Sequence, residues 1–128
     1  MISGKKVLVV DDDKDVADLL QCFVTRMGHE TRTAGDGMDA MGVYREFRPD
    51  AVVLDVIMPK MDCVEFLTWL GKDFPNESVI LITSGYPGDY IDSIRILSEG
   101  LGAGKSRFLP KPLGFEAFRS ALDELLAE

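Results

Sequence analysis

The strongest constraint on the fold of this chain is the regular alternation of short apolar runs with longer segments in which apolar residues recur at helical spacing. The short runs predict β-strands, and the longer patterns predict helices of about 10 to 15 residues. Strands that alternate with helices form right-handed βαβ units and a parallel sheet. The expected strands are residues 7–10, 31–34, 51–54, 79–82 and 108–109. The expected helices carry apolar stripes at residues 16–27, 40–47, 64–70, 91–101 and 115–125.

The relative strength of the strand signals predicts the order of the strands. Residues 7–10, 51–54 and 79–82 are continuous apolar runs, which is typical of strands covered on both faces. The second run, TRTA, and the fifth, RFLP, are weaker or interrupted, as edge strands can be. We therefore expect an α/β, doubly wound (βα)5 fold with a five-stranded parallel sheet in the order 2-1-3-4-5 and helices on both faces. The length of 128 residues suits one domain over residues 1–128.

Charge and apolar content exclude several classes of function. The formal net charge is −8, and there is no cluster of Lys or Arg beyond Lys5-Lys6, so direct binding of nucleic acid is not expected. No apolar run approaches the roughly 20 residues that span a bilayer, and the N-terminus has no signal-peptide pattern. We therefore expect no membrane contact and a cytoplasmic location. Cys22 and Cys63 match no metal or redox spacing and are expected to be reduced, in or near packed helix faces.

Polar side chains gather where the predicted strands end. In the predicted order, four of these ends are neighbours, about 5 Å from strand to strand. Ligands of such sheets bind beyond the carboxyl ends of the strands, so acids, hydroxyl groups and an amine should face one small volume. The residues are Asp11, Asp12 and Asp13 after the first strand, Asp55 after the third, Thr83 and Ser84 after the fourth, and Lys111 after the fifth.

This set of groups predicts phosphoryl transfer to a carboxylate. Asp55 would be the nucleophile that forms an aspartyl phosphate. The acids of the first strand would hold Mg²⁺, which takes oxygen ligands and offsets the repulsion between the nucleophile and the phosphoryl oxygens. Lys111 would supply a positive charge to the phosphoryl group, and Thr83 would supply a hydroxyl donor.

At these residues the chain resembles the response-regulator receiver domains of bacterial two-component signalling. The resemblance covers nearly the whole chain, in the motifs KKVLVVDDD, AGDGMDAM, PDAVVLDVIMPKMD, VILITSGY and FLPKPL. It implies that Asp55 is the phosphoacceptor and that a sensor histidine kinase or a histidine phosphotransfer protein is the donor. Phosphorylation would alter the binding of an unknown output partner, for which we expect the face made by the fourth helix, the fifth strand and the fifth helix.

The resemblance also implies how Mg²⁺ is held. Asp12 and Asp55 would ligate the ion directly, together with the backbone carbonyl of Ile57. Asp11 would act largely through water.

The same resemblance implies a switch and a local bond geometry. Thr83 would swing toward the phosphoryl group while Phe108 changes rotamer. Ser84 stands where Ala or Gly is more usual, close to the phosphoryl position, where its hydroxyl would crowd the site or add a donor. The Lys111-Pro112 bond would be cis.

Two further features depart from the family pattern. Cys63 stands where most receivers have a glycine, so its backbone angles should be ordinary. The segment GKSR before Phe108 is two residues longer than is common, which leaves the path into the last strand open.

Some polar residues have a structural explanation. Asp13 is expected to be a helix N-cap, and Asp36-Gly37 is expected to be a turn that starts a helix. His29 follows the helix stop at Gly28 and is expected to be an exposed loop residue.

Two other functions remain open. A phosphatase of the haloacid dehalogenase type would use a nucleophile on the first strand in an Asp-x-Asp-x-Thr/Val pattern; Asp11 and Asp13 fit the acids, but Asp15 does not fit the last position. A non-catalytic scaffold of receiver fold would work without phosphate, although such domains usually lose an acid or the lysine, and this chain keeps them.

Overall fold

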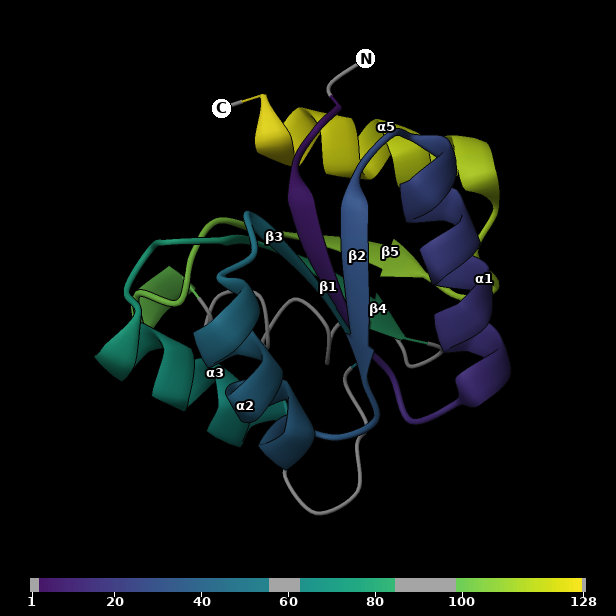
Figure 1. Ribbon diagram of the computed structural model, residues 1–128. Coiled ribbons are helices and arrows are strands. Elements are labelled where there is room, and N and C mark those ends of the chain that lie inside the picture. Colours follow the sequence, from purple (N-terminus) through teal and green to yellow (C-terminus); the bar gives the residue numbers. More distant parts are fainter. Residues whose placement is uncertain (1–2, 56–62, 85–98, 128) are drawn as a thin grey trace.

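The computed structural model describes residues 3–55, 63–84 and 99–127, which form one sheet with helices on both faces (Figure 1). All strands run parallel in the order β2-β1-β3-β4-β5, so the predicted order is confirmed. The strands are β1 (Lys6–Val10), β2 (Glu30–Ala34), β3 (Ala51–Asp55), β4 (Val79–Ser84) and β5 (Ser106–Pro110). The helices within the described ranges are α1 (Lys14–Arg26), α2 (Gly37–Phe47), α3 (Cys63–Asp73) and α5 (Phe115–Leu126).

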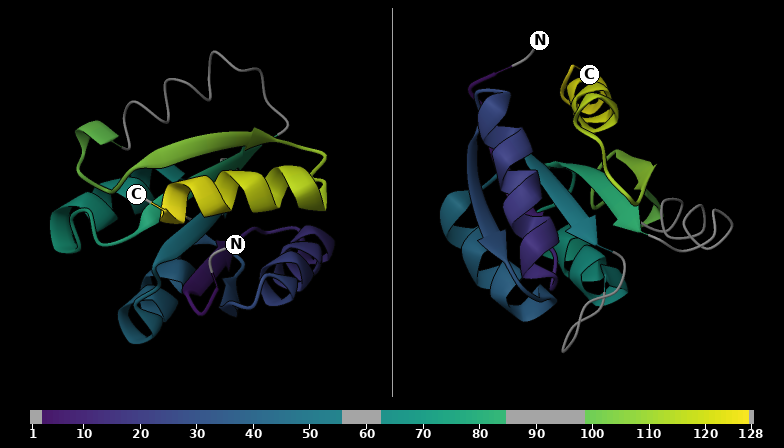
Figure 2. Two further views of the ribbon diagram at one scale, coloured as in Figure 1. Left: turned by 90° about the horizontal axis from the view of Figure 1, so that it is seen from above. Right: turned by 90° about the vertical axis from the view of Figure 1, so that its right-hand side faces the viewer.

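Alternate side chains of the central strands enter two separate cores. Leu8 and Val10 of β1 lie in a core with α2 and α3, whereas Val7 and Val9 lie in a core with α1 and α5. The views in Figure 2 show these two helix layers on either side of the sheet. Every residue of β3 is buried. Because both faces of the sheet are covered, the central strands are continuous apolar runs.

The segment that leads into β5 packs closely against the fold despite its extra residues. A Cβ atom at Gly71 of α3 would collide with the backbone carbonyl of Leu101, and one at Gly104 would collide with the carbonyl of Ser78. β5 then pairs with β4 along its whole length. The two additional residues therefore do not displace the last strand from the sheet.

Both β4 and β5 extend beyond the apolar runs that predict them. β4 continues to Ser84 and β5 begins at Ser106, because the backbone of each strand supplies hydrogen-bond partners to the other. The helix expected at residues 91–101 lies almost entirely outside the described residues.

Two helices begin at the aspartates that the sequence assigns to them. The Asp13 carboxylate accepts hydrogen bonds from the backbone N–H groups of Asp15 at 3.0 Å and Val16 at 3.3 Å. The Asp36 carboxylate accepts one from the N–H of Asp39 at 2.8 Å. Both carboxylates satisfy donors that the first turn leaves unpaired. The predicted N-cap at Asp13 and the predicted helix start at Asp36-Gly37 are therefore confirmed.

The two cysteines form no disulfide and lie in different surroundings. Cys63 begins α3 and is buried, and positive φ among the described non-glycine residues occurs at Arg48 and Asn76, so its expected ordinary backbone angle is confirmed. Cys22 lies exposed on α1. Within the described ranges, no helix combines the length and the apolar character needed to cross a bilayer.

His29 is buried, so the prediction of an exposed loop residue is wrong. The residue does follow a turn at Gly28, which has φ +88°. However, the chain entering β1 bonds to this turn: the N–H of Gly4 donates to the carbonyl of Gly28 at 3.0 Å, and the N–H of Lys5 donates to His29 Nδ1 at 3.1 Å. These contacts leave His29 5% exposed.

Candidate functional site

The register of the parallel strands brings the predicted site residues to one edge of the sheet. Asp55 is the last residue of β3 and lies opposite Thr83 of β4. β1 ends one residue before Asp11, and β5 ends one residue before Lys111. The carboxyl ends of four adjacent strands therefore meet, which is where ligands bind in open parallel sheets.

Three carboxylates converge at this edge. Asp11, Asp12 and Asp55 each offer an oxygen atom, and these atoms lie within 4.8 Å of one another. Asp11 is 3% exposed and Asp55 is 7% exposed, whereas Asp12 is open to solvent. A set of convergent carboxylate oxygens, one of them solvent-accessible, is the donor set that suits a hard divalent cation that keeps part of its water shell.

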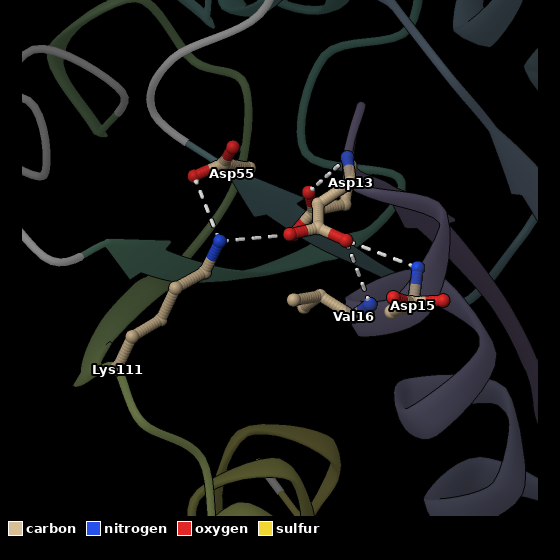
Figure 3. Close-up of polar contacts among 6 residues, drawn as sticks. Asp13, Asp15, Val16, Asp55 and Lys111 are labelled. Carbon is tan, nitrogen blue, oxygen red and sulfur yellow. Dashed lines mark hydrogen bonds and ion pairs between the residues drawn. The ribbon is translucent and has the colours of Figure 1, made fainter.

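Lys111 supplies a positive charge between two of the acids. Its Nζ lies 3.1 Å from Asp11 Oδ2 and 3.4 Å from Asp55 Oδ1 (Figure 3). The other oxygen of Asp11, Oδ1, accepts the backbone N–H of Asp13 at 2.9 Å. Asp11 is thus fixed at both oxygens, and it positions the amine beside Asp55. The sequence did not predict this direct contact between Asp11 and Lys111, because it depends on the path of the chain after β5.

The electrostatics of the site set an unusual pKa for Asp55. Burial and the neighbouring Asp11 carboxylate raise the pKa of Asp55 to about 6, and Lys111 only partly opposes them. The pKa of Lys111 is also raised, since the hydrogen bond to Asp11 and the charge of Asp55 outweigh burial, which acts to lower it. Lys111 is therefore charged at neutral pH, while Asp55 titrates near the physiological range.

The structure describes three of the remaining predicted residues, which lie at or near the same edge. Thr83 is fully buried, and its Oγ1 has no hydrogen-bond partner among the described residues. Phe108 of β5 is half-buried and packs against the core on the α2–α3 face. Ser84 ends β4 opposite Pro110. Ile57 lies outside the described residues.

The bond after β5 has the expected geometry. The Lys111-Pro112 peptide is cis. Asp13 turns its carboxylate to the start of α1, as Figure 3 shows, and is not among the three convergent carboxylates.

Comparison with known sequences identifies the family of this chain. The family model described as the response regulator receiver domain matches residues 7–123. The chain is 38% identical over 125 residues to the response regulator MprA of Mycobacterium sp. (strain KMS), which covers 95% of this chain and 47% of that protein. The chain therefore spans about half the length of the curated relatives it matches.

Solved structures show the same fold. The Francisella response regulator 1452 receiver domain matches with a TM-score of 0.80 at 27% identity, over 97% of this chain and 98% of that one. The chemotaxis protein CheY4 of Vibrio cholerae matches with a TM-score of 0.79 at 25% identity, over 96% of this chain and 99% of that one. Sheet order, the acidic edge and the family match agree, and the chain belongs to the response regulator receiver domains, a family of signalling domains.

Proposed function

We propose that this chain is the phosphoacceptor of a two-component phosphorelay and that Asp55 receives a phosphoryl group from a phosphohistidine in the presence of Mg²⁺. One observation carries the proposal: three carboxylates converge within 4.8 Å, and the Lys111 amine contacts two of them. Core packing does not require this arrangement, because buried like charges cost free energy unless cations pair with them.

The carboxylates fit a Mg²⁺ ion. Asp12 and Asp55 would hold the ion directly, with the backbone carbonyl of Ile57 as a further ligand, and Asp11 would act largely through water. When bound, the ion supplies positive charge that offsets the repulsion between the acids and the phosphoryl oxygens. The protein supplies oxygen ligands only, which matches the preference of Mg²⁺.

Asp55 and Lys111 would carry out the transfer. A carboxylate oxygen of Asp55 forms a bond to phosphorus while the phosphorus–nitrogen bond of the donor breaks, and the imidazole nitrogen leaves with the electron pair. The Lys111 amine, held beside Asp55 by Asp11, would contact a phosphoryl oxygen as a point charge. Thr83 would donate its buried hydroxyl, and Ser84 would make a further phosphoryl contact.

The phosphoryl group would change what the protein binds. Phosphorylation would bias a two-state equilibrium in the region of Thr83 and Phe108. The donor would be a sensor histidine kinase or a histidine phosphotransfer protein, and the output partner would bind the face made by residues 91–101, β5 and α5. We further propose that the domain takes part in hydrolysis of its own phosphoryl group and that it works in the cytoplasm as one unit of residues 1–128.

A small phosphodonor tests the proposal. Incubation of the protein with acetyl phosphate and Mg²⁺ should produce a phosphate-sized mass gain that peptide mapping places on Asp55. The gain should be absent in Asp55→Asn and in the presence of a chelator, and it should persist in Asp18→Asn, which changes an exposed carboxylate of α1.

Other outcomes would favour the alternative functions. A phosphoryl group mapped to Asp11 would indicate a phosphatase of the haloacid dehalogenase type, whose nucleophile lies after the first strand. No mass gain with any donor would indicate a scaffold that works without phosphate. Either result would overturn the proposal.

A further inference from the structure

His29 lies at the amino-terminal edge of the sheet, at the opposite end of the strands from the carboxylates. Its Nδ1 accepts the backbone N–H of Lys5 at 3.1 Å, at the entry to β1. Because Nδ1 is an acceptor, the neutral imidazole carries its proton on Nε2. His29 is 5% exposed, and Nε2 is buried without a hydrogen-bond partner among the described residues.

Asp123 of α5 offers the complementary acceptor. Its Oδ1 is also buried and has no partner in the described part of the chain. Its Oδ2 lies 3.5 Å from Nη1 of Arg119, one turn earlier in the helix. Figures 1 and 2 show the end of α5 next to the start of β1. The N–H of Lys5, which precedes β1, donates to the imidazole of His29.

The two unpaired groups also act on each other electrostatically. Burial lowers the pKa of His29, and Asp123 is the strongest of the charges that oppose this effect. Buried polar groups in native proteins almost always find a partner in the protein or in an ordered water. A buried donor and a buried acceptor that are both unpaired, on elements that pack together, are therefore natural partners of each other.

We propose that His29 and Asp123 form a buried polar link that fastens the end of α5 to the amino-terminal edge of the sheet, with Nε2–H donating to Oδ1 through one buried water. The Lys5 N–H completes the link on the other side of the ring. One imidazole thus joins α5, the entry to β1 and the start of β2. This link is independent of the proposed phosphoacceptor chemistry, which takes place at the other edge of the sheet.

Protonation of His29 would break one half of this link. A proton on Nδ1 removes the acceptor of the Lys5 N–H, while Nε2–H would still donate on the Asp123 side. The charged groups that face the ring are Asp123 on α5 and Asp50 before β3, which favour protonation, and Lys5 before β1, which opposes it.

The direction of the pH effect follows from this balance. Burial outweighs the two acids, so the pKa of His29 lies below its usual value. The folded state then binds fewer protons than the unfolded state at mildly acidic pH. The stability that neutral His29 contributes to the folded protein is therefore present above the usual histidine pKa. This contribution is lost as the pH falls through and below that value.

An NMR titration tests whether the charge of Asp123 acts on His29. His29 is the only histidine of the chain, so imidazole signals report on it alone. Asp123→Asn keeps an acceptor oxygen but removes the charge, and it should move the titration midpoint of His29 to lower pH. Glu46→Gln, which removes an exposed charge on α2, should leave the midpoint unchanged. An equal midpoint in wild type and in Asp123→Asn would overturn the link.

Amide hydrogen exchange tests whether the link holds the end of α5 against the sheet. His29→Gln places an amide nitrogen near the position of Nε2, whereas His29→Asn retains only an acceptor near Nδ1. The Asn variant should therefore speed exchange in the last turns of α5 by about tenfold relative to β3 in the same sample, the effect of one unpaired buried acceptor. The Gln variant should stay near wild type. Unchanged exchange of α5 in the Asn variant would contradict the proposal, and if that variant fails to fold, the Asp123→Asn titration decides.

Discussion

The ionised carboxylate of Asp55 is held in surroundings that disfavour it. Burial removes water from the group, and Asp11 adds a like charge, so the pKa of Asp55 rises to about 6 despite the nearby amine of Lys111. A carboxylate with a raised pKa is a stronger base than a solvated one. The unfavourable charge is the physical reason that a cation or a phosphoryl group bound here would change the stability of the whole domain.

Replacement of Asp55 by Asn should stabilise the protein at neutral pH. The pKa of Asp55 is about 6 in the folded protein, against an ordinary value of 3.8. Between these two pH values, the folded state binds a proton at Asp55 that the unfolded state does not. The wild type therefore gains stability from this group as the pH falls through 6. Asp55→Asn should raise the free energy of unfolding by about 1–3 kcal/mol at neutral pH, and the gain should vanish near pH 4.

Thermal or denaturant unfolding at both pH values measures this effect. Asp18→Asn is the matched control, because Asp18 is exposed and its surface pair with Lys14 should contribute little. A variant at position 55 that is less stable than wild type at neutral pH would show that the ionised carboxylate is not disfavoured.

Lys111 should lower the pKa of Asp55 through the contact at 3.4 Å. In metal-free protein, Lys111→Met should therefore move the titration midpoint of Asp55 upward from about 6, since the opposing positive charge is removed. The carboxyl ¹³C chemical shift of Asp55 measures the midpoint. Lys72→Met, on the exposed end of α3, should leave the midpoint of Asp55 unchanged. An unchanged midpoint in Lys111→Met would refute the electrostatic role assigned to Lys111.

At the scale of elements, the sequence predicts the strands and helices that have a strong hydrophobic pattern. It misses strand ends and burial that depend on contacts with neighbouring elements. The continuous apolar runs correctly place β1, β3 and β4 at the centre. The ends of β5 could not be predicted, because Ser106 and Arg107 join the strand through pairing with β4 rather than through their own preference. The burial of His29 likewise depends on Lys5, a residue distant in sequence whose backbone covers it.

The contact between α3 and the segment before β5 should make the protein sensitive to substitution of one helical glycine, Gly71. Gly71→Ala would place a Cβ against the backbone carbonyl of Leu101, so it should lower the free energy of unfolding by about 1–3 kcal/mol. Gly42→Ala is the control within α2, where a Cβ meets open space. That variant should stabilise the protein by up to about 1 kcal/mol, because Ala favours the helix.

Chemical denaturation of both variants provides the measurement. The free energy of unfolding should fall in Gly71→Ala, at a packed helix position, and rise in Gly42→Ala, at an exposed one. Equal effects would mean that α3 does not lie as close to Leu101 as the structure places it.

At the scale of the whole molecule, the candidate site is assembled from residues far apart in the sequence. The strand order was enough to predict that Asp11, Asp12, Asp55 and Lys111 gather at one edge, since parallel strands end together. The pairing of Lys111 with Asp11 could not be predicted, because side-chain reach depends on the turn that follows β5. The sequence also gives no reason for the link between His29 and Asp123, which requires α5 to pack beside β1.

Addition of Mg²⁺ should stabilise the folded protein by mass action. At a free Mg²⁺ concentration one hundred times the dissociation constant, the gain should be about 2.7 kcal/mol, because the unfolded chain does not bring the three carboxylates together. Differential scanning calorimetry with Mg²⁺, and then with a chelator, measures the shift in Tm. The shift should be lost in Asp12→Asn and absent when NaCl replaces Mg²⁺ at equal ionic strength; an equal shift with NaCl would indicate screening alone.

The contact between Lys111 and Asp11 joins residues that are 100 positions apart. During synthesis, the amine that neutralises the first acids emerges only after most of the chain has left the ribosome. Until then, the acids at the carboxyl ends of β1 and β3 lack the amine that contacts them in the folded protein. The order of translation therefore delays completion of this polar centre until β5 joins the sheet.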